Sequence, residues 1–168
     1  PHHLGEGKLH GAQENDFYYF LGVAYRQLGN EAKATEMFEK AAVGNAQPVA
    51  AMYYNDAKPD KIFYQGLALR ALVREDKARS RVNALVTYGE KHLFDTVVMD
   101  YFAVSLPDLL IWEDSLQAKN DIHCRYMMAL GYYGLGKTDK ARQLLADLLR
   151  TDKNHLGIQA LKTFMAES

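Results

Sequence analysis

The stretch FYYFLGVAYRQLGNEAKATEMFEKAA, residues 17–42, predicts two antiparallel α-helices joined by a tight turn. In its first half, apolar residues recur at the three- and four-residue spacing of one helix face: Leu21, Ala24, Tyr25 and Leu28. The sequence Gly29-Asn30 then supplies the glycine with which helices commonly end. In the second half, one face is small, large and small: Ala34, Phe38 and Ala41. We expect this first hairpin to span about residues 15–43.

A second hairpin is expected over about residues 60–91. Its Gly66 aligns with Gly22, and a glycine inside a helix, which costs about 1 kcal/mol relative to alanine, is explained by a second helix approaching closely. Val73 stands where the first hairpin has its turn residue Gly29, so the copy is weaker at the turn.

A third hairpin is expected over about residues 121–150, with Asn120-Asp121 as its N-terminal cap and Gly136 at its turn. A last helix over residues 155–166 is expected to cover it. Irregular insertions separate the three hairpins, at residues 44–59 and 92–120. We therefore expect one helical domain over residues 15–168, after a lead-in loop over residues 1–14.

The composition is that of a globular protein, with 48% hydrophobic and 24% charged residues in a chain of 168. The 20 Lys and Arg residues nearly cancel the 21 Asp and Glu residues, and the net charge of −1 gives no electrostatic drive towards nucleic acid. No apolar run reaches the roughly 18 residues of a membrane span. The single cysteine excludes an internal disulfide.

No group of residues indicates catalysis, a metal or another cofactor, so we do not expect an enzyme. Three histidines lie in the first ten residues, but no pair of ligands at helical spacing completes them. The neighbours Glu113-Asp114 and His123-Cys124 point in different directions if they are helical, so neither pair converges on one atom. We expect a solvated face for the first pair and a buried, inert thiol for Cys124.

The hairpins resemble tetratricopeptide repeats (TPRs), through Tyr18, Leu21, Gly22, Tyr25, Gly29, Ala34, Phe38 and Ala41. The resemblance implies an all-α fold of TPR-like stacked helical hairpins, an α-α superhelix with irregular insertions and a C-terminal capping helix. The hairpins are further apart than the family's period of about 34 residues, which implies an irregular array.

A second resemblance is to the C-terminal helical regions of long bacterial proteins of unassigned function, whose upstream domains are β-rich and carbohydrate-related. It is carried by Tyr53-Tyr54-Asn55-Asp56, by IFYQGLALR at residues 62–70 and by Ser105-Leu106-Pro107-Asp108. It implies the C-terminal module of a larger bacterial protein, in the cytoplasm or the periplasm.

In the TPR family, the first helix of each hairpin lines a groove that binds proteins. The resemblance assigns six residues to a candidate groove: Tyr19, Arg26, Phe63, Arg70, Tyr126 and Tyr133. Tyr and Arg dominate protein-binding hot spots, and Arg holds carboxylates through two hydrogen bonds. We expect a protein or peptide partner, with an upstream domain of the same polypeptide as one candidate. Alternatively, the aromatic residues pack against the insertions and the groove is filled.

Two other functions remain open. One is structural support for an adjoining carbohydrate-active domain. The other, more remote, is a nucleotide-binding enzyme, because GYYGLGKT at residues 131–138 matches the phosphate-loop motif G-x-x-x-x-G-K-T. A phosphate loop is extended and follows a β-strand, whereas this segment has helical periodicity and Gly136 aligns with the turn glycine. We therefore expect the match at Gly131–Thr138 to be coincidental.

Overall fold

The computed structural model describes residues 13–50, 58–97 and 113–166, and these residues form seven α-helices and no strand. In chain order the helices are α1 (Asn15–Gln27), α2 (Glu31–Ala41), α3 (Lys61–Ala71), α4 (Glu75–His92), α5 (Glu113–Gly134), α6 (Thr138–Thr151) and α7 (Leu156–Ala166). The predicted all-α fold of helical hairpins is confirmed. The contacts divide the chain into two compact units, Pro1–Arg81 and Val82–Ser168, with the boundary inside α4.

Parts of the predicted insertions and of the lead-in loop lie outside the described residues, namely 1–12, 51–57 and 98–112. The three N-terminal histidines and the Ser105-Leu106-Pro107-Asp108 sequence are among them. Of the helices described, none is both long and apolar enough to cross a membrane.

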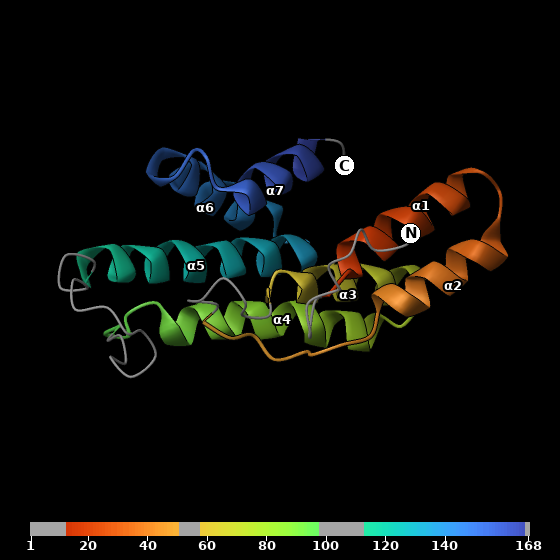
Figure 1. Ribbon diagram of the computed structural model, residues 1–168, viewed down its shortest axis with the longest axis horizontal. Helices are drawn as coiled ribbons and strands as arrows, with labels where there is room; N and C mark the ends of the chain where they lie inside the picture. Colours follow the sequence, from red (N-terminus) through yellow and green to blue (C-terminus); the bar gives the residue numbers. More distant parts are fainter. Residues whose placement is uncertain (1–12, 51–57, 98–112, 167–168) are drawn as a thin grey trace, which may run out of the picture. The chain divides into compact units, whose positions relative to one another are not determined.

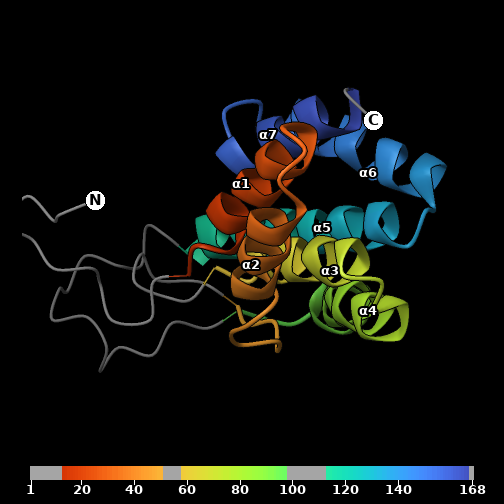
Figure 2. The same cartoon turned by 90° about the vertical axis from the view of Figure 1, so that its right-hand side faces the viewer.

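In the first unit, α1 and α2 form an antiparallel hairpin, and α3 packs against both (Figures 1 and 2). The side chain of Asn30 caps α2 by accepting a hydrogen bond of 3.1 Å from the backbone N–H of Lys33. At the other end of the hairpin, the Asn15 amide donates hydrogen bonds of 2.7 Å to the carbonyls of Ala41 and Val43. These bonds satisfy carbonyls that the end of α2 leaves free.

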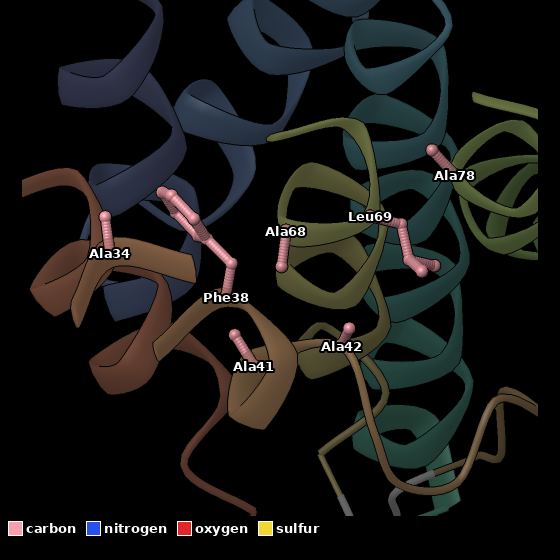
Figure 3. Close-up of a cluster of buried hydrophobic side chains, with 7 residues drawn as sticks. All are labelled: Ala34, Phe38, Ala41, Ala42, Ala68, Leu69 and Ala78. Atoms are coloured by element: carbon pink, nitrogen blue, oxygen red, sulfur yellow. The ribbon is translucent and has the colours of Figure 1, made fainter. Parts of the chain in front are cut away.

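The core of this unit is built from small residues around one large one. It contains Ala34, Phe38, Ala41 and Ala42 from the α2 segment, Ala68 and Leu69 from α3 and Ala78 from α4 (Figure 3). A Cβ atom on Gly22 would lie 2.7 Å from the Phe38 ring. The predicted close approach at Gly22 is thus confirmed, and the ring of Phe38 occupies the space. Burying a phenylalanine in this way contributes about 2–3 kcal/mol.

The three hairpins share one turn geometry, a Schellman motif. In the first, the N–H of Gly29 bonds to the carbonyl of Arg26 at 3.0 Å and the N–H of Asn30 to that of Tyr25 at 2.9 Å. The same two bonds recur around Val73 and around Gly136. The left-handed residue has φ of 74° at Gly29, 60° at Val73 and 75° at Gly136. The alignment of the three hairpins is therefore correct at the turns.

Val73 provides a direct test of this turn. It is β-branched, 91% exposed and left-handed, a conformation that costs a non-glycine residue about 1–2 kcal/mol. We expect Val73→Gly to raise the free energy of unfolding by roughly 0.5–1 kcal/mol, because glycine's greater freedom in the unfolded chain offsets part of the relief. Urea unfolding measures the change.

Gly29 is the matched control for this substitution. Nothing lies within 4 Å of a Cβ atom built on Gly29, so Gly29→Val changes the backbone strain without a clash. We expect Gly29→Val to destabilise the protein by about the amount that Val73→Gly stabilises it. Equal stability of Val73→Gly and the natural chain would contradict the assigned strain.

In the second unit, α5 and α6 form a hairpin and α7 contacts α6. The described part of α5 runs from Glu113, inside the segment predicted to be an insertion, through Asn120 without a break. The prediction that Asn120-Asp121 caps a helix is therefore wrong. The Asn120 side chain is buried inside α5 and donates a hydrogen bond of 2.9 Å to the carbonyl of His92, at the end of α4. The Asn120 amide therefore bonds to the C-terminal end of α4 and does not cap a helix of its own.

Candidate functional site

Arg26, predicted to lie in a binding groove, is held by its own unit. Its Nε lies 3.3 Å from Oε2 of Glu31, and its Nη2 donates a hydrogen bond of 3.2 Å to the carbonyl of Ala71. Its guanidinium carbon lies 4.6 Å from the centre of the Phe38 ring. The arginine therefore joins the first hairpin to the C-terminal end of α3, where a cation is favoured by the helix dipole.

Arg70 makes the equivalent pairing in the second hairpin. Its Nε and Nη2 donate hydrogen bonds of 3.1 and 3.2 Å to the two carboxylate oxygens of Glu75. The hydrogen bond from Arg70 lowers the pKa of Glu75. The expected two-bond grip on a carboxylate is present, but the carboxylate belongs to the chain. The spacing Arg-x-x-x-x-Glu, present in both hairpins at Arg26–Glu31 and Arg70–Glu75, was the sequence pattern that could have revealed this.

The two aromatic groove residues of the first unit have different environments. Phe63 is 1% exposed and therefore does not line an open groove. Its ring centre lies 5.4 Å from that of Tyr64. Tyr19 is half-buried, with its ring centre 5.9 Å from that of Phe38 and 6.1 Å from that of Tyr64.

In the second unit, α7 covers the corresponding positions. Tyr126 is buried, its ring centre lies 5.2 Å from that of His155, and a Cβ atom on Gly157 would lie 2.6 Å from its Cζ. The half-buried Tyr133 meets Phe164 of α7 edge to face at 5.8 Å. Tyr126 is therefore part of the packing beside the capping helix and does not line an open groove.

The first unit does expose an aromatic group that the sequence analysis missed. Phe20 is 48% exposed, and its ring centre lies 5.4 Å from that of Tyr19 and 5.7 Å from that of Tyr64. We call Tyr19, Phe20 and Tyr64 the aromatic surface. Phe20 and Tyr64 occupy equivalent positions in the first two hairpins, so aligning their aromatic residues would have found the pair.

Charged groups border the aromatic surface. Nζ of Lys61 lies 2.5 Å from a carboxylate oxygen of Asp16, which joins α1 to α3. Burial raises the pKa of Asp60, and the neighbouring Asp16 adds to the rise while Lys61 opposes it. Burial also raises the pKa of Tyr64 to about 12, with smaller contributions from Asp16 and Asp60. The Tyr64 phenol is therefore neutral at physiological pH and keeps its hydrogen-bond donor.

The phosphate-loop motif is contradicted by the backbone. Gly131–Gly134 is the last turn of α5, and the segment continues through the Schellman turn at Gly136 to α6. Gly131 is buried, and a Cβ atom there would lie 2.7 Å from the carbonyl oxygen of Val82 and 2.5 Å from a Val86 methyl group. Helical amides are used within the helix and do not cradle phosphates. The nucleotide-binding alternative based on Gly131–Thr138 is therefore wrong.

We expect Gly131→Ala to lower the free energy of unfolding by about 2–4 kcal/mol, because the added methyl group meets backbone atoms that cannot rotate away. Gly134→Ala is the matched control in the same helix, since a Cβ atom there meets only the Val82 side chain. It should cost clearly less. Chemical unfolding compares the two, and equal costs would contradict the close packing of the helices at Gly131.

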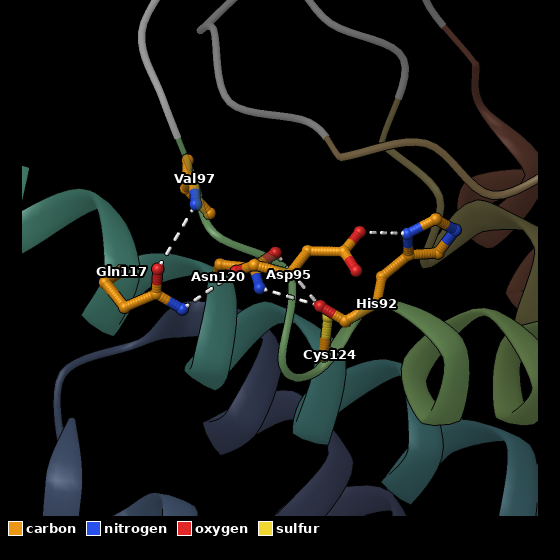
Figure 4. Close-up of polar contacts among 6 residues, drawn as sticks. All are labelled: His92, Asp95, Val97, Gln117, Asn120 and Cys124. Atoms are coloured by element: carbon orange, nitrogen blue, oxygen red, sulfur yellow. Dashed lines mark hydrogen bonds and ion pairs between the residues drawn. The ribbon is translucent and has the colours of Figure 1, made fainter.

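A polar cluster lies around Cys124 in the second unit (Figure 4). Nδ1 of His92 lies 2.6 Å from a carboxylate oxygen of Asp95, and the Gln117 amide bonds to the carbonyl of Asp95 at 3.1 Å and the N–H of Val97 at 3.2 Å. These bonds attach the segment after α4 to α5. The thiol of Cys124 is fully buried and donates to Oδ1 of Asn120 at 3.6 Å.

The cluster makes Cys124 a structural residue. Burial, with Asp95 and Asp121 as smaller causes, raises the pKa of its thiol to about 11. Reactive cysteines have a lowered pKa and are accessible to solvent, whereas Cys124 has a raised pKa and is buried. In the part of the chain that the structure describes, no group of three or more His, Cys, Asp or Glu side chains is placed to hold a metal ion.

We expect the Cys124 thiol to react with a disulfide reagent at about pH 8 at least a hundredfold more slowly in the folded protein than in urea. Burial blocks the reagent, and the raised pKa leaves little thiolate. Absorbance of the released thiol measures the rate. Reaction at the rate of the unfolded chain would contradict the buried position.

These features define a protein of packed helical hairpins with an exposed aromatic surface. Two tetratricopeptide-repeat models match the chain, one at residues 16–42 and the other at residues 123–155. The first match is the α1–α2 hairpin, and the second covers most of α5 and all of α6. The matches support a TPR protein, a class of protein-interaction scaffold that is typically non-catalytic. No solved structure matches the chain significantly.

Proposed function

We propose that this chain is a protein-binding scaffold whose aromatic surface binds a peptide segment with an apolar anchor residue. The carrying observation is the exposure of Phe20 between the half-buried Tyr19 and Tyr64. Large exposed aromatic groups on rigid helices are favourable contacts, because they bury much area and lose few rotamers.

The surrounding interactions support a preorganised surface. The Asp16–Lys61 ion pair joins α1 to α3 beside the aromatic rings, and the Arg26 side chain joins α1 to the end of α3. A surface with fixed side chains loses less conformational entropy on binding than a mobile one. The Tyr64 hydroxyl, neutral at physiological pH, supplies a polar group that orients the bound segment.

The test is a displayed library of random peptides of about a dozen residues, selected on the natural chain. Selected peptides are expected to share an apolar residue and to bind Phe20→Ala at least about tenfold more weakly, the loss typical of a central aromatic contact. Fluorescence anisotropy with a labelled peptide measures the affinity.

Phe94→Ala is the matched control. Phe94 is 87% exposed and lies in the other unit, so the same truncation should leave peptide affinity unchanged. Circular dichroism establishes that both variants remain folded. Selected peptides that bind Phe20→Ala as tightly as the natural chain would contradict the proposed surface.

We propose further that the chain is the C-terminal module of a larger bacterial protein, with an upstream domain as its partner. A support role for an adjoining carbohydrate-active domain is the second candidate. It is favoured by one observation: the carboxylates that pair with Arg26 and Arg70 come from their own hairpins. Deleting this module from a natural polypeptide that already carries Phe20→Ala distinguishes the two. Peptide binding is then already abolished, so only a support role predicts that the deletion lowers the stability of the adjoining domain.

A further inference from the structure

The helix α1 carries a second apolar face, on the side away from α3. Phe17 is 61% exposed and Leu28 is 80% exposed, and between them lie the exposed Ala24 and the half-buried Leu21. These four residues, Phe17, Leu21, Ala24 and Leu28, follow helical spacing, and we call them the outer stripe. An exposed row of this kind costs free energy in water unless another surface covers it.

The same register positions are covered in the second hairpin. The shared Schellman turns align Gly29 with Val73. In this alignment, the residues equivalent to the outer stripe are Lys61, Gln65, Ala68 and Leu72. Gln65 and Ala68 are completely buried there. Both belong to α3, which packs against α1 and α2 of the preceding hairpin.

The third hairpin repeats the arrangement in the second unit. When Gly136 is aligned with Gly29, the residues equivalent to the outer stripe are Cys124, Met128, Gly131 and Leu135. The first three are buried against α4, the second helix of the preceding hairpin. A Cβ atom built on Gly131 would lie 2.7 Å from the carbonyl oxygen of Val82. A Cβ atom built on Gly89 would lie 2.6 Å from the carbonyl oxygen of Cys124. The helices are thus in close contact at these positions.

We infer that the outer stripe of α1 is the docking face for the second helix of a further helical hairpin, placed before α1 in the natural polypeptide. Where the structure shows this register position covered, the preceding hairpin supplies the cover. The residue equivalent to Gly131, where α4 comes close, is also small in the other two hairpins, at Ala24 and Ala68. A small residue at this position allows a neighbouring helix to approach closely.

The structure also indicates the chemistry of the docking helix. In α4 the covering residues are Val82, Val86 and Gly89, at a spacing of four and three. The docking helix should therefore present small and branched apolar residues at that spacing. The exposed positions of α2, α4 and α6 are mostly charged or polar, so the second helices of the three hairpins in another copy do not offer such a face.

This inference does not depend on peptide binding at the aromatic surface, and its test is separate. The first test compares the 168-residue chain with the natural polypeptide extended by about 40 residues before residue 1, enough for one more hairpin. Phe17→Asp is introduced into both, and urea unfolding gives the ratio of folded to unfolded protein. We expect a change of less than about threefold in the 168-residue chain and a loss of at least about thirtyfold in the extended polypeptide, where the carboxylate is buried.

Phe94→Asp is the matched control, and its effect should be the same in both proteins. If Phe17→Asp prevents folding of the extended polypeptide altogether, Phe17→Ser gives the same comparison with a smaller penalty. An equal effect of the Phe17 substitution in both proteins would overturn the inference, as would a natural polypeptide with no helical sequence before residue 1.

A dimer of the 168-residue chain that Phe17→Asp dissociates would also overturn it, in favour of a second copy as the occupant. Sedimentation velocity measures this directly. The affinity of peptides selected on the aromatic surface separates the two proposals, because Leu28→Asp, at the end of the outer stripe that is far from Phe20, should leave that affinity unchanged while Phe20→Ala reduces it.

Discussion

The close approach of helices at small residues is the constraint on which the structure depends. The ring of Phe38 occupies the space that a side chain on Gly22 would need, and the backbone of α4 lies where a side chain on Gly131 would be. Close contact lets short helices bury apolar surface that a single hairpin leaves exposed, so each hairpin depends on its neighbour. The same dependence underlies the inference that the outer stripe of α1 is a docking face for another helix.

The turns convert this packing into a register. All three Schellman motifs place a left-handed residue at the same point, and they do so even where the residue is Val73. The packing of α3 and α4 against their neighbours therefore outweighs the local preference of a β-branched residue. Because the register is common, residues of different hairpins can be compared position by position, which is the basis for identifying both the aromatic surface and the outer stripe.

The arginines show how intramolecular contacts redefine a predicted site. Arg26 and Arg70 have the chemistry to bind a partner's carboxylate, and they bind Glu31 and Glu75 instead. Exposed ion pairs of this kind contribute little stability, typically below about 1 kcal/mol, but they hold the side chains in one orientation. The proposed recognition therefore rests on Tyr19, Phe20 and Tyr64, whose apolar area is only partly buried.

The sequence by itself determined the all-α class, the hairpin turns and the close contact at Gly22, because helical periodicity and glycine placement are local properties of the chain. It did not determine that α5 passes through Asn120 without a break, since the amide of Asn120 is satisfied by the end of a helix far away in the sequence. Nor did it separate Phe63, which is enclosed, from Phe20, which is exposed. Only the tertiary structure decided these points, because burial depends on which helices pack together and not on the residue type alone.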